Sequence, residues 1–206
     1  MATTVAGQIG HHHDDAAKQE QIANLKLATW LYIASETVIF AVLIGAFAVF
    51  RILEPQYAKA VHAELGVALV TINTFILLAS SYAMVMALRA AEMKNRQGFM
   101  QWMGAVIGMG LVFVGLQFVE YTELSHLAIT LGDSTDDFGR FGMYFYAPTF
   151  FHGAHVLVGA LMGLEVLRRG MRGDFDDNAI IVELFGLYWH FVDVVWIILF
   201  ALIYLV

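Results

Sequence analysis

The chain has 206 residues, 60% of them hydrophobic and 14% charged, with a formal net charge of −7 and no cysteine. Soluble domains are about half apolar and about a quarter charged, so this composition favours a membrane protein. The lack of cysteine excludes disulfides, thiolate metal ligands and iron–sulfur clusters, and the absence of a basic stripe argues against nucleic-acid binding.

Residues 1–24 are polar and contain no apolar segment of the kind found in a secretory signal. They include the tract His11 to Asp15, which is a metal-binding tract, a solvated tail or a remnant of an expression sequence. We therefore predict a flexible polar tail over residues 1–24 and a transmembrane domain over residues 25–206.

Five long apolar runs follow the tail, and each exceeds the roughly 20 residues that cross a bilayer as a helix. They are residues 27–50, 65–88, 99–124, 141–167 and 179–206. None alternates like a barrel strand, so we predict an all-α integral membrane bundle of five transmembrane helices. Short connections predict that consecutive helices are antiparallel neighbours, and the pairs Gly104/Gly108 and Gly159/Gly163 predict close helix contacts.

Lysine and arginine are concentrated on one side of this predicted bundle, in the tail, the second loop and the fourth loop. These residues are Lys18, Lys26, Arg89, Lys94, Arg96, Arg168, Arg169 and Arg172, whereas Arg51, Lys59 and Arg140 fall on the other side. Positive charge marks cytoplasmic loops. The N-terminus is therefore predicted in the cytoplasm and the C-terminus outside.

Polar and ionisable side chains recur inside the predicted spans, where they are costly and therefore mark candidate sites. They are Glu36, Asn73, Gln117, Glu120, His152, His155, His190 and Asp193. His152/His155 and His190/Asp193 are spaced i, i+3, so each pair shares a helix face.

Three interpretations of these groups remain open. They hydrogen-bond one another and fix helix packing or a subunit contact. Alternatively, His152 and His190 are axial haem ligands, or Glu36, His152, His155 and Asp193 hold a metal. In the third interpretation Glu36 and Asp193 carry protons or ions along a path through the membrane.

Five segments, in order, carry a family resemblance: Tyr32–Glu36, Thr71–Ser80, Gln117–Tyr121, Phe151–Val156 and Gly186–Trp196. Together they resemble subunit III of the haem–copper terminal oxidases, in the short bacterial form with five helices. The resemblance spans about residues 27–206.

The resemblance implies a non-catalytic subunit of a cytochrome c or quinol oxidase, which reduces oxygen to water and translocates protons in the bacterial inner membrane. It implies direct packing on subunit I, a complex that includes subunit II, and haem and copper only in partner subunits. Bound phospholipid and support of sustained turnover and proton uptake are also implied. The alternatives are a subunit III-like accessory protein of nitric oxide reductase and a stand-alone bis-histidine membrane cytochrome.

Some residue roles follow from the resemblance alone. Glu36 matches a buried carboxyl group known in the family for reaction with carbodiimide, which implies a desolvated acid. Arg169 matches a basic residue near the cytoplasmic end of its helix, where it either binds a lipid phosphate or serves only membrane topology. His152, His190 and Asp193 match signature positions and are interpreted as packing and interface groups.

Overall fold

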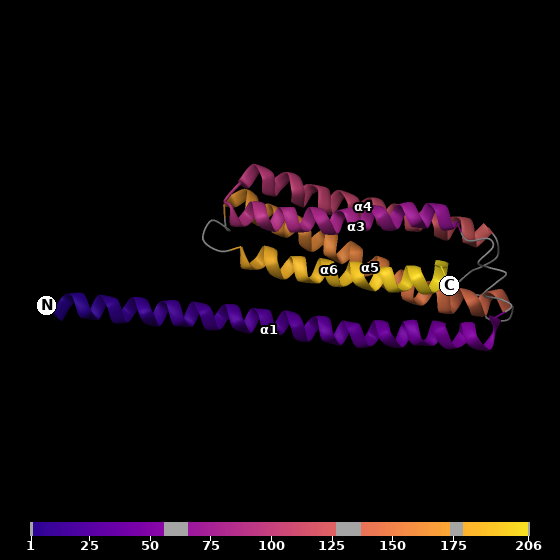
Figure 1. The fold of residues 1–206 in the computed structure, drawn as a ribbon, viewed down its shortest axis with the longest axis horizontal. Helices are drawn as coiled ribbons and strands as arrows, with labels where there is room; N and C mark the ends of the chain where they lie inside the picture. Colours follow the sequence, from indigo (N-terminus) through magenta and orange to yellow (C-terminus); the bar gives the residue numbers. More distant parts are fainter. Residues whose placement is uncertain (1, 56–65, 127–136, 174–178, 206) are drawn as a thin grey trace. The chain divides into compact units, whose positions relative to one another are not determined.

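The structure is a computed structural model that describes residues 2–55, 66–126, 137–173 and 179–205. It divides into two compact units, Met1–Glu36 and Thr37–Val206. The elements, in chain order, are α1 (Ala2–Leu53), α3 (Val67–Glu92), α4 (Arg96–His126), α5 (Asp137–Arg172), α6 (Ile180–Phe200) and the π-helical turn η1 (Ala201–Leu205) (Figure 1).

Five helical segments of the described chain are long and apolar enough to cross a membrane, which confirms the predicted number of spans. They are Ala17–Leu53, Val67–Glu92, Arg96–Ser125, Gly142–Arg172 and Ile180–Leu205. In a helix every backbone polar group is satisfied within the segment, which lipid requires. The side of the membrane on which each terminus lies stays a prediction.

Helix α1 begins at Ala2 and so includes residues that we predicted as a polar tail. The flexibility of residues 1–24 stays a prediction. The His11–Asp15 tract, as a metal site, lies outside the residues whose side chains are described.

The connection between α3 and α4 is short because two local features end one helix and start the next. Lys94 has a positive φ of 56°, and the Asn95 amide donates back to the Ala90 carbonyl at 2.9 Å. This is the left-handed turn that commonly closes a helix. The Asn95 side chain then accepts a hydrogen bond from the Gly98 amide at 3.0 Å, which caps α4. Helix α4 therefore begins at Arg96, three residues before the predicted start of the span.

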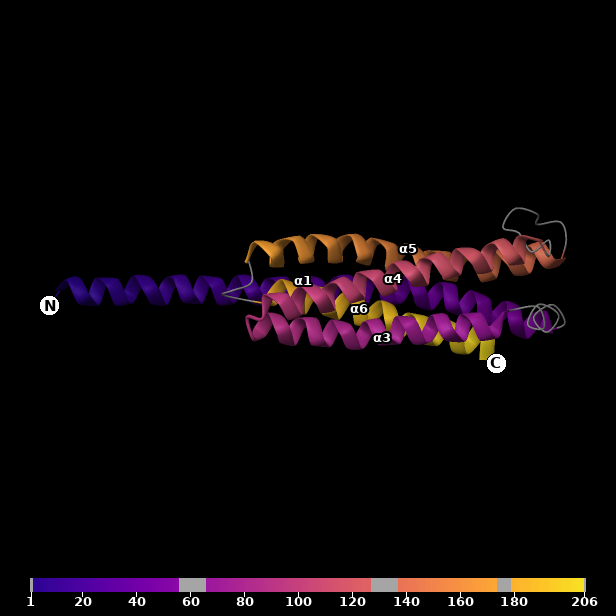
Figure 2. The same cartoon turned by 90° about the horizontal axis from the view of Figure 1, so that it is seen from above.

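Helices α3 to α6 pack around a shared core. Helix α3 packs against α4 and α6, and α5 also packs against α4 and α6. The two views show α3 and α4 side by side and running in opposite directions (Figures 1 and 2). The predicted neighbour relation therefore holds for the pairs α3–α4, α4–α5 and α5–α6.

The part of α1 that belongs to the second unit, residues 37–53, contacts helices that are distant in sequence. The Phe40 ring lies 5.1 Å from the Phe151 ring of α5 and 6.1 Å from the Phe191 ring of α6. The Arg51 guanidinium donates to the Leu202 carbonyl in η1. These contacts lead to α5, α6 and η1, which are not the sequence neighbours of the first span.

Trp189 of α6 sits between two glycines in the centre of the bundle. A Cβ added at Gly110 of α4 would lie 2.7 Å from the indole, and one added at Gly159 of α5 would lie 2.9 Å from it. Only glycine at both positions leaves room for this ring. The Gly159/Gly163 prediction is thus confirmed, whereas Gly104 and Gly108 have nothing within 4 Å of an added Cβ.

Candidate functional site

Three side-chain hydrogen bonds join α3 to α6 along one seam. The Trp196 indole donates to the Thr74 hydroxyl at 2.9 Å, and the Trp189 indole donates to the Ser80 hydroxyl at 2.9 Å. A third bond joins the Ser81 hydroxyl and His190 Nδ1 at 2.6 Å. A buried indole N–H normally finds an acceptor, and here both acceptors come from the facing helix. The seam therefore fixes the register of α3 against α6.

His152 is fully buried and packs as an aromatic ring. It stacks on Trp196 with ring centroids 4.9 Å apart, and the Phe113 ring meets it edge-on at 5.6 Å. Neither imidazole nitrogen has a hydrogen-bond partner among the described residues. His152 is therefore part of the buried aromatic packing of the bundle.

His155, predicted to share a face with His152, has a different environment. Its Nδ1 lies 2.8 Å from the Phe151 carbonyl, and its ring contacts Phe40 at 5.1 Å. The Tyr188 hydroxyl donates to the His155 backbone carbonyl at 2.9 Å, which ties α6 to α5. The surroundings of His155 are thus those of a packing group.

Asp193 and Asn73 are buried polar residues, and some of their side-chain oxygens have no hydrogen-bond partner in the described part of the chain. Asn73 donates to the Phe113 carbonyl at 3.1 Å, but its Oδ1 has no donor in the described part of the chain. Both Asp193 oxygens also lack a well-formed hydrogen bond there, although Ser81 lies nearby and bonds His190 instead. Each such group costs about 1–3 kcal/mol when left unpaired.

A second polar cluster joins α4, α5 and η1. The Tyr204 hydroxyl donates to the Glu120 carboxylate at 2.7 Å, and both residues are buried. Gln117 donates to the Tyr121 hydroxyl at 3.1 Å and to the Thr149 carbonyl at 3.3 Å. Gln117 and Glu120 therefore lie one turn apart on α4 but bond to different partners.

Glu36 is the last residue of the first unit, whereas the other polar residues predicted inside the spans belong to the second unit. Its side chain is partly exposed. Whether Glu36 is a desolvated acid in its membrane setting stays a prediction.

Arg169 forms an ion triad at the C-terminal end of α5. Its Nε bonds Glu165 at 3.0 Å, and Arg168 bonds the same carboxylate through two nitrogens at 2.6 and 2.7 Å. All three side chains are nearly half exposed. The triad places two cations at the predicted cytoplasmic end of the span, and a role for Arg169 in phosphate binding stays a prediction.

The described residues do not bring together three or more histidine, aspartate or glutamate side chains that could hold a metal. The suggested set of Glu36, His152, His155 and Asp193 draws Glu36 from the first unit and the other three from the second, so a metal site formed by these four stays a hypothesis. His190, the other candidate haem ligand, bonds Ser81 through its Nδ1, and haem ligation by this residue stays a hypothesis.

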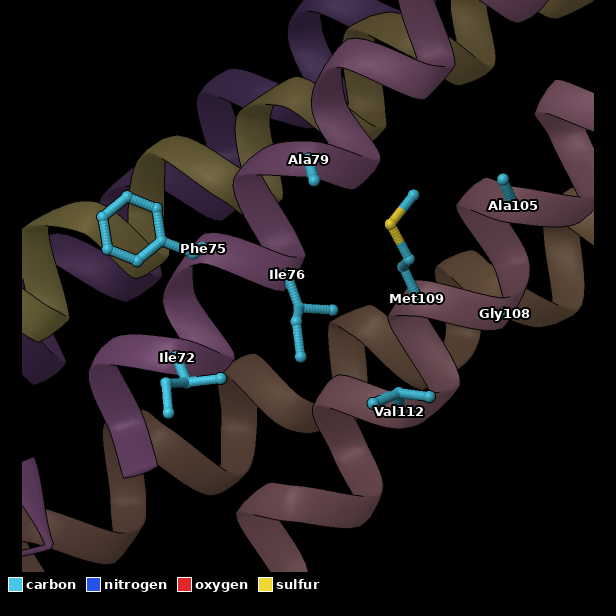
Figure 3. A pocket seen from close by; sticks show the side chains of 8 residues that line it. All are labelled: Ile72, Phe75, Ile76, Ala79, Ala105, Gly108, Met109 and Val112. Carbon is cyan, nitrogen blue, oxygen red and sulfur yellow. The ribbon is translucent and has the colours of Figure 1, made fainter. Parts of the chain in front are cut away.

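An apolar groove of about 630 Å³ lies between α3 and α4. Its lining consists of Ile72, Phe75, Ile76 and Ala79 from α3 and Ala105, Gly108, Met109 and Val112 from α4. Figure 3 shows the Ile76 and Met109 side chains in the space between the two helices. Gly108, predicted as a close-contact residue, instead forms part of this open groove.

Several residues that hold the site together were not predicted. Ser80, Ser81 and Thr149 are ordinary residues in an apolar helix, and only their partners reveal their roles. The spacing of Trp189 and Trp196, two turns apart on one face, was an available signal for the α3–α6 seam. No sequence signal marked Tyr204, because it reaches Glu120 from a π-helical turn.

Comparison with known proteins identifies a family and several relatives. The family model described as cytochrome c oxidase subunit III matches residues 4–206. A cytochrome c oxidase subunit 3 from Synechocystis is 36% identical over 85% of this chain and 72% of its own length. One from Thermostichus vulcanus is 33% identical over 100% of this chain and 94% of its own length. A probable quinol oxidase subunit 3 from Staphylococcus saprophyticus is 33% identical over 88% of each chain.

Proposed function

Because the chain belongs to the cytochrome c oxidase subunit III family, which confirms the resemblance, we propose that it is the non-catalytic subunit III of a proton-pumping oxygen reductase. In this assembly the partner subunits reduce oxygen to water. The chain is a multi-pass membrane protein within an oxidase complex. Its proposed task is to pack on subunit I and support sustained turnover and proton uptake.

The main observation behind this proposal is that polar side chains inside the spans contact neighbouring helices of the same chain. The Trp196 and Trp189 indole nitrogens and His190 Nδ1 form hydrogen bonds across the α3–α6 seam. His152 is packed between aromatic rings. Groups arranged in this way give a rigid helical support, so we place haem and copper in the partner subunits and no redox centre in this chain.

The relatives support a role that does not depend on the electron donor. Some are named as subunits of cytochrome c oxidases and one as a subunit of a probable quinol oxidase, at similar identity. A subunit that braces its neighbour serves either kind of complex. Subunit II and the other oxidase subunits are the proposed further partners.

The charges at the ends of the spans support the proposed membrane setting. Arg89, Lys94 and Arg96 flank the α3–α4 connection, and Arg168 and Arg169 lie near the end of α5. Because positive charge marks cytoplasmic loops, we propose that the two connections lie on the cytoplasmic face of a bacterial inner membrane, with the C-terminus outside. Arg169, held half-exposed by Glu165, is a proposed contact for a phospholipid phosphate.

The proposal is tested by measuring oxygen consumption of the purified complex with and without this chain. A bracing subunit predicts an initial rate close to that of the intact complex, followed by a faster loss of activity during continued turnover. Restoring the chain should restore the lifetime of the activity. Loss of all oxygen consumption from the first turnover, with the haem spectrum of the remaining subunits unchanged, would contradict a non-catalytic role.

A further inference from the structure

A second pocket, of about 240 Å³, lies between α4 and α5 and has a polar atom in its lining. Gln117 and Tyr121 of α4 contribute to the lining, together with Gly153 of α5. Gln117 is only 3% exposed, and its Oε1 has no hydrogen-bond donor among the described residues. The pocket thus contains a buried acceptor without a partner, a state that costs free energy unless a donor is supplied.

The orientation of the Gln117 amide is fixed by its neighbours. Its Nε2 donates to the Thr149 backbone carbonyl at 3.3 Å, and that oxygen can only accept. The amide oxygen must therefore be on the opposite side. There it lies 3.0 Å from the position that a Cβ on Gly153 would take. The glycine leaves space beside the acceptor that any other residue would fill.

No nearby hydroxyl can turn to serve this acceptor. The Tyr121 hydroxyl donates to Thr149 Oγ1 at 2.9 Å, and Thr149 Oγ1 in turn donates to the Phe145 carbonyl at 2.8 Å. Each hydroxyl has one proton, so both protons are in use. The pocket therefore presents an acceptor and requires a ligand that brings a donor.

The surroundings restrict what such a ligand can be. Phe118, Phe150 and Leu157 form an apolar rim that is 68%, 67% and 42% exposed, in helices that cross the membrane. Gln117 lies eight residues before the end of its span at Ser125, or roughly 12 Å along the helix. An ammonium group at this depth has no counter-charge in the lining and is costly. A neutral hydroxyl fits, and a ketone or ether lacks the donor.

We propose that this pocket binds the hydroxyl end of a membrane-soluble alcohol or phenol, with Gln117 Oε1 as its hydrogen-bond acceptor. The volume is below the roughly 300–1,000 Å³ of sites that enclose a whole drug-sized ligand. The pocket therefore holds the hydroxyl and the first part of the apolar body, and the remaining chain lies over the Phe118 and Phe150 rings. The inference does not depend on the role of the chain in an oxidase.

The test uses native membranes that contain the full chain and two photoreactive probes. One probe is a hexadecanol bearing a diazirine near its hydroxyl, and the other is its methyl ether, which differs only in the missing donor. Labelled peptides from α4 and α5 are quantified by mass spectrometry. One hydrogen bond changes affinity by about fivefold, so the alcohol should label these peptides about fivefold more than the ether.

Variants locate the interaction. Gln117→Leu removes the acceptor, and Gly153→Ala places a methyl group beside it, so both should lower alcohol labelling to the level of the ether. Gly115→Ala is the matched control, because an added Cβ there has nothing within 4 Å. It should label like the unaltered chain.

Equal labelling by alcohol and ether in the unaltered chain would overturn the proposal, as would alcohol labelling that survives Gly153→Ala. Absence of labelling in α4 and α5 would mean that no lipid-soluble alcohol occupies the pocket, and would overturn it too. If Gln117→Leu fails to accumulate in the membrane, the comparison of the two probes and the Gly153 variant still decide the outcome.

Discussion

Gly159→Ala is the change that tests the packing of the bundle most sharply. The new methyl group would lie 2.9 Å from Trp189 Cζ3 and 3.0 Å from the Tyr188 ring. Trp189 cannot retreat easily, since Gly110 contacts its other edge and its indole is bonded to Ser80. Overpacking of a well-filled core costs about 1–3 kcal/mol. Loss of the indole hydrogen bond adds about 1 kcal/mol if the ring tilts.

Gly104→Ala provides the control for this prediction. It makes the same change in a transmembrane helix, with the same gain in helix propensity, but the added methyl group meets nothing within 4 Å. The Gly159 variant should therefore be less stable than the Gly104 variant by about 1–4 kcal/mol. Detergent-extracted complex carrying a fluorescent fusion of each variant is heated in steps, and the intact fraction is measured by size-exclusion chromatography. Equal midpoints for the two variants would refute the packing of Trp189 between two glycines.

Three further predictions concern the polar side chains. His152→Phe should preserve stability or raise it slightly, because a phenyl ring can pack between Trp196 and Phe113 without the two unpaired nitrogens. His152→Ala should instead cost about 2–5 kcal/mol by leaving a cavity. Equal midpoints for the two variants in the same heating assay would contradict this prediction. Tyr204→Phe should destabilise the chain by about 1–3 kcal/mol because Glu120 loses its donor, and an unchanged midpoint would show that this bond contributes little. Glu36→Gln should leave the initial rate of oxygen consumption of the complex largely intact, and complete loss of turnover with normal assembly would show that Glu36 has a different role.

The sequence was sufficient to predict the spans and the polar residues within them. Lengths of apolar runs depend on bilayer thickness alone, so five spans could be counted without any knowledge of packing. Asn73, Gln117, Glu120, His152 and Asp193 are buried, as the cost of exposing polar groups to lipid predicts, whereas His155 and His190 are only partly buried.

The partners of these residues could not be predicted, because they depend on how helices rotate against one another. His152 and His190 are equivalent in a sequence reading, yet one stacks on an indole and the other bonds a serine. Tyr204 reaches Glu120 only because a π-helical turn changes the register at the end of α6. Two similar glycine pairs also differ, since Gly159 of one lies against Trp189 and Tyr188 while Gly108 of the other lines an open groove.

The most direct test of the central claim is purification of this chain from native membranes in mild detergent, followed by an optical spectrum. A bracing subunit predicts that the chain co-purifies with a haem-bearing oxidase subunit, and that it shows no Soret band once separated from that partner. A chain that purifies alone with a stoichiometric Soret band, lost in His152→Ala or His190→Ala, would contradict the account.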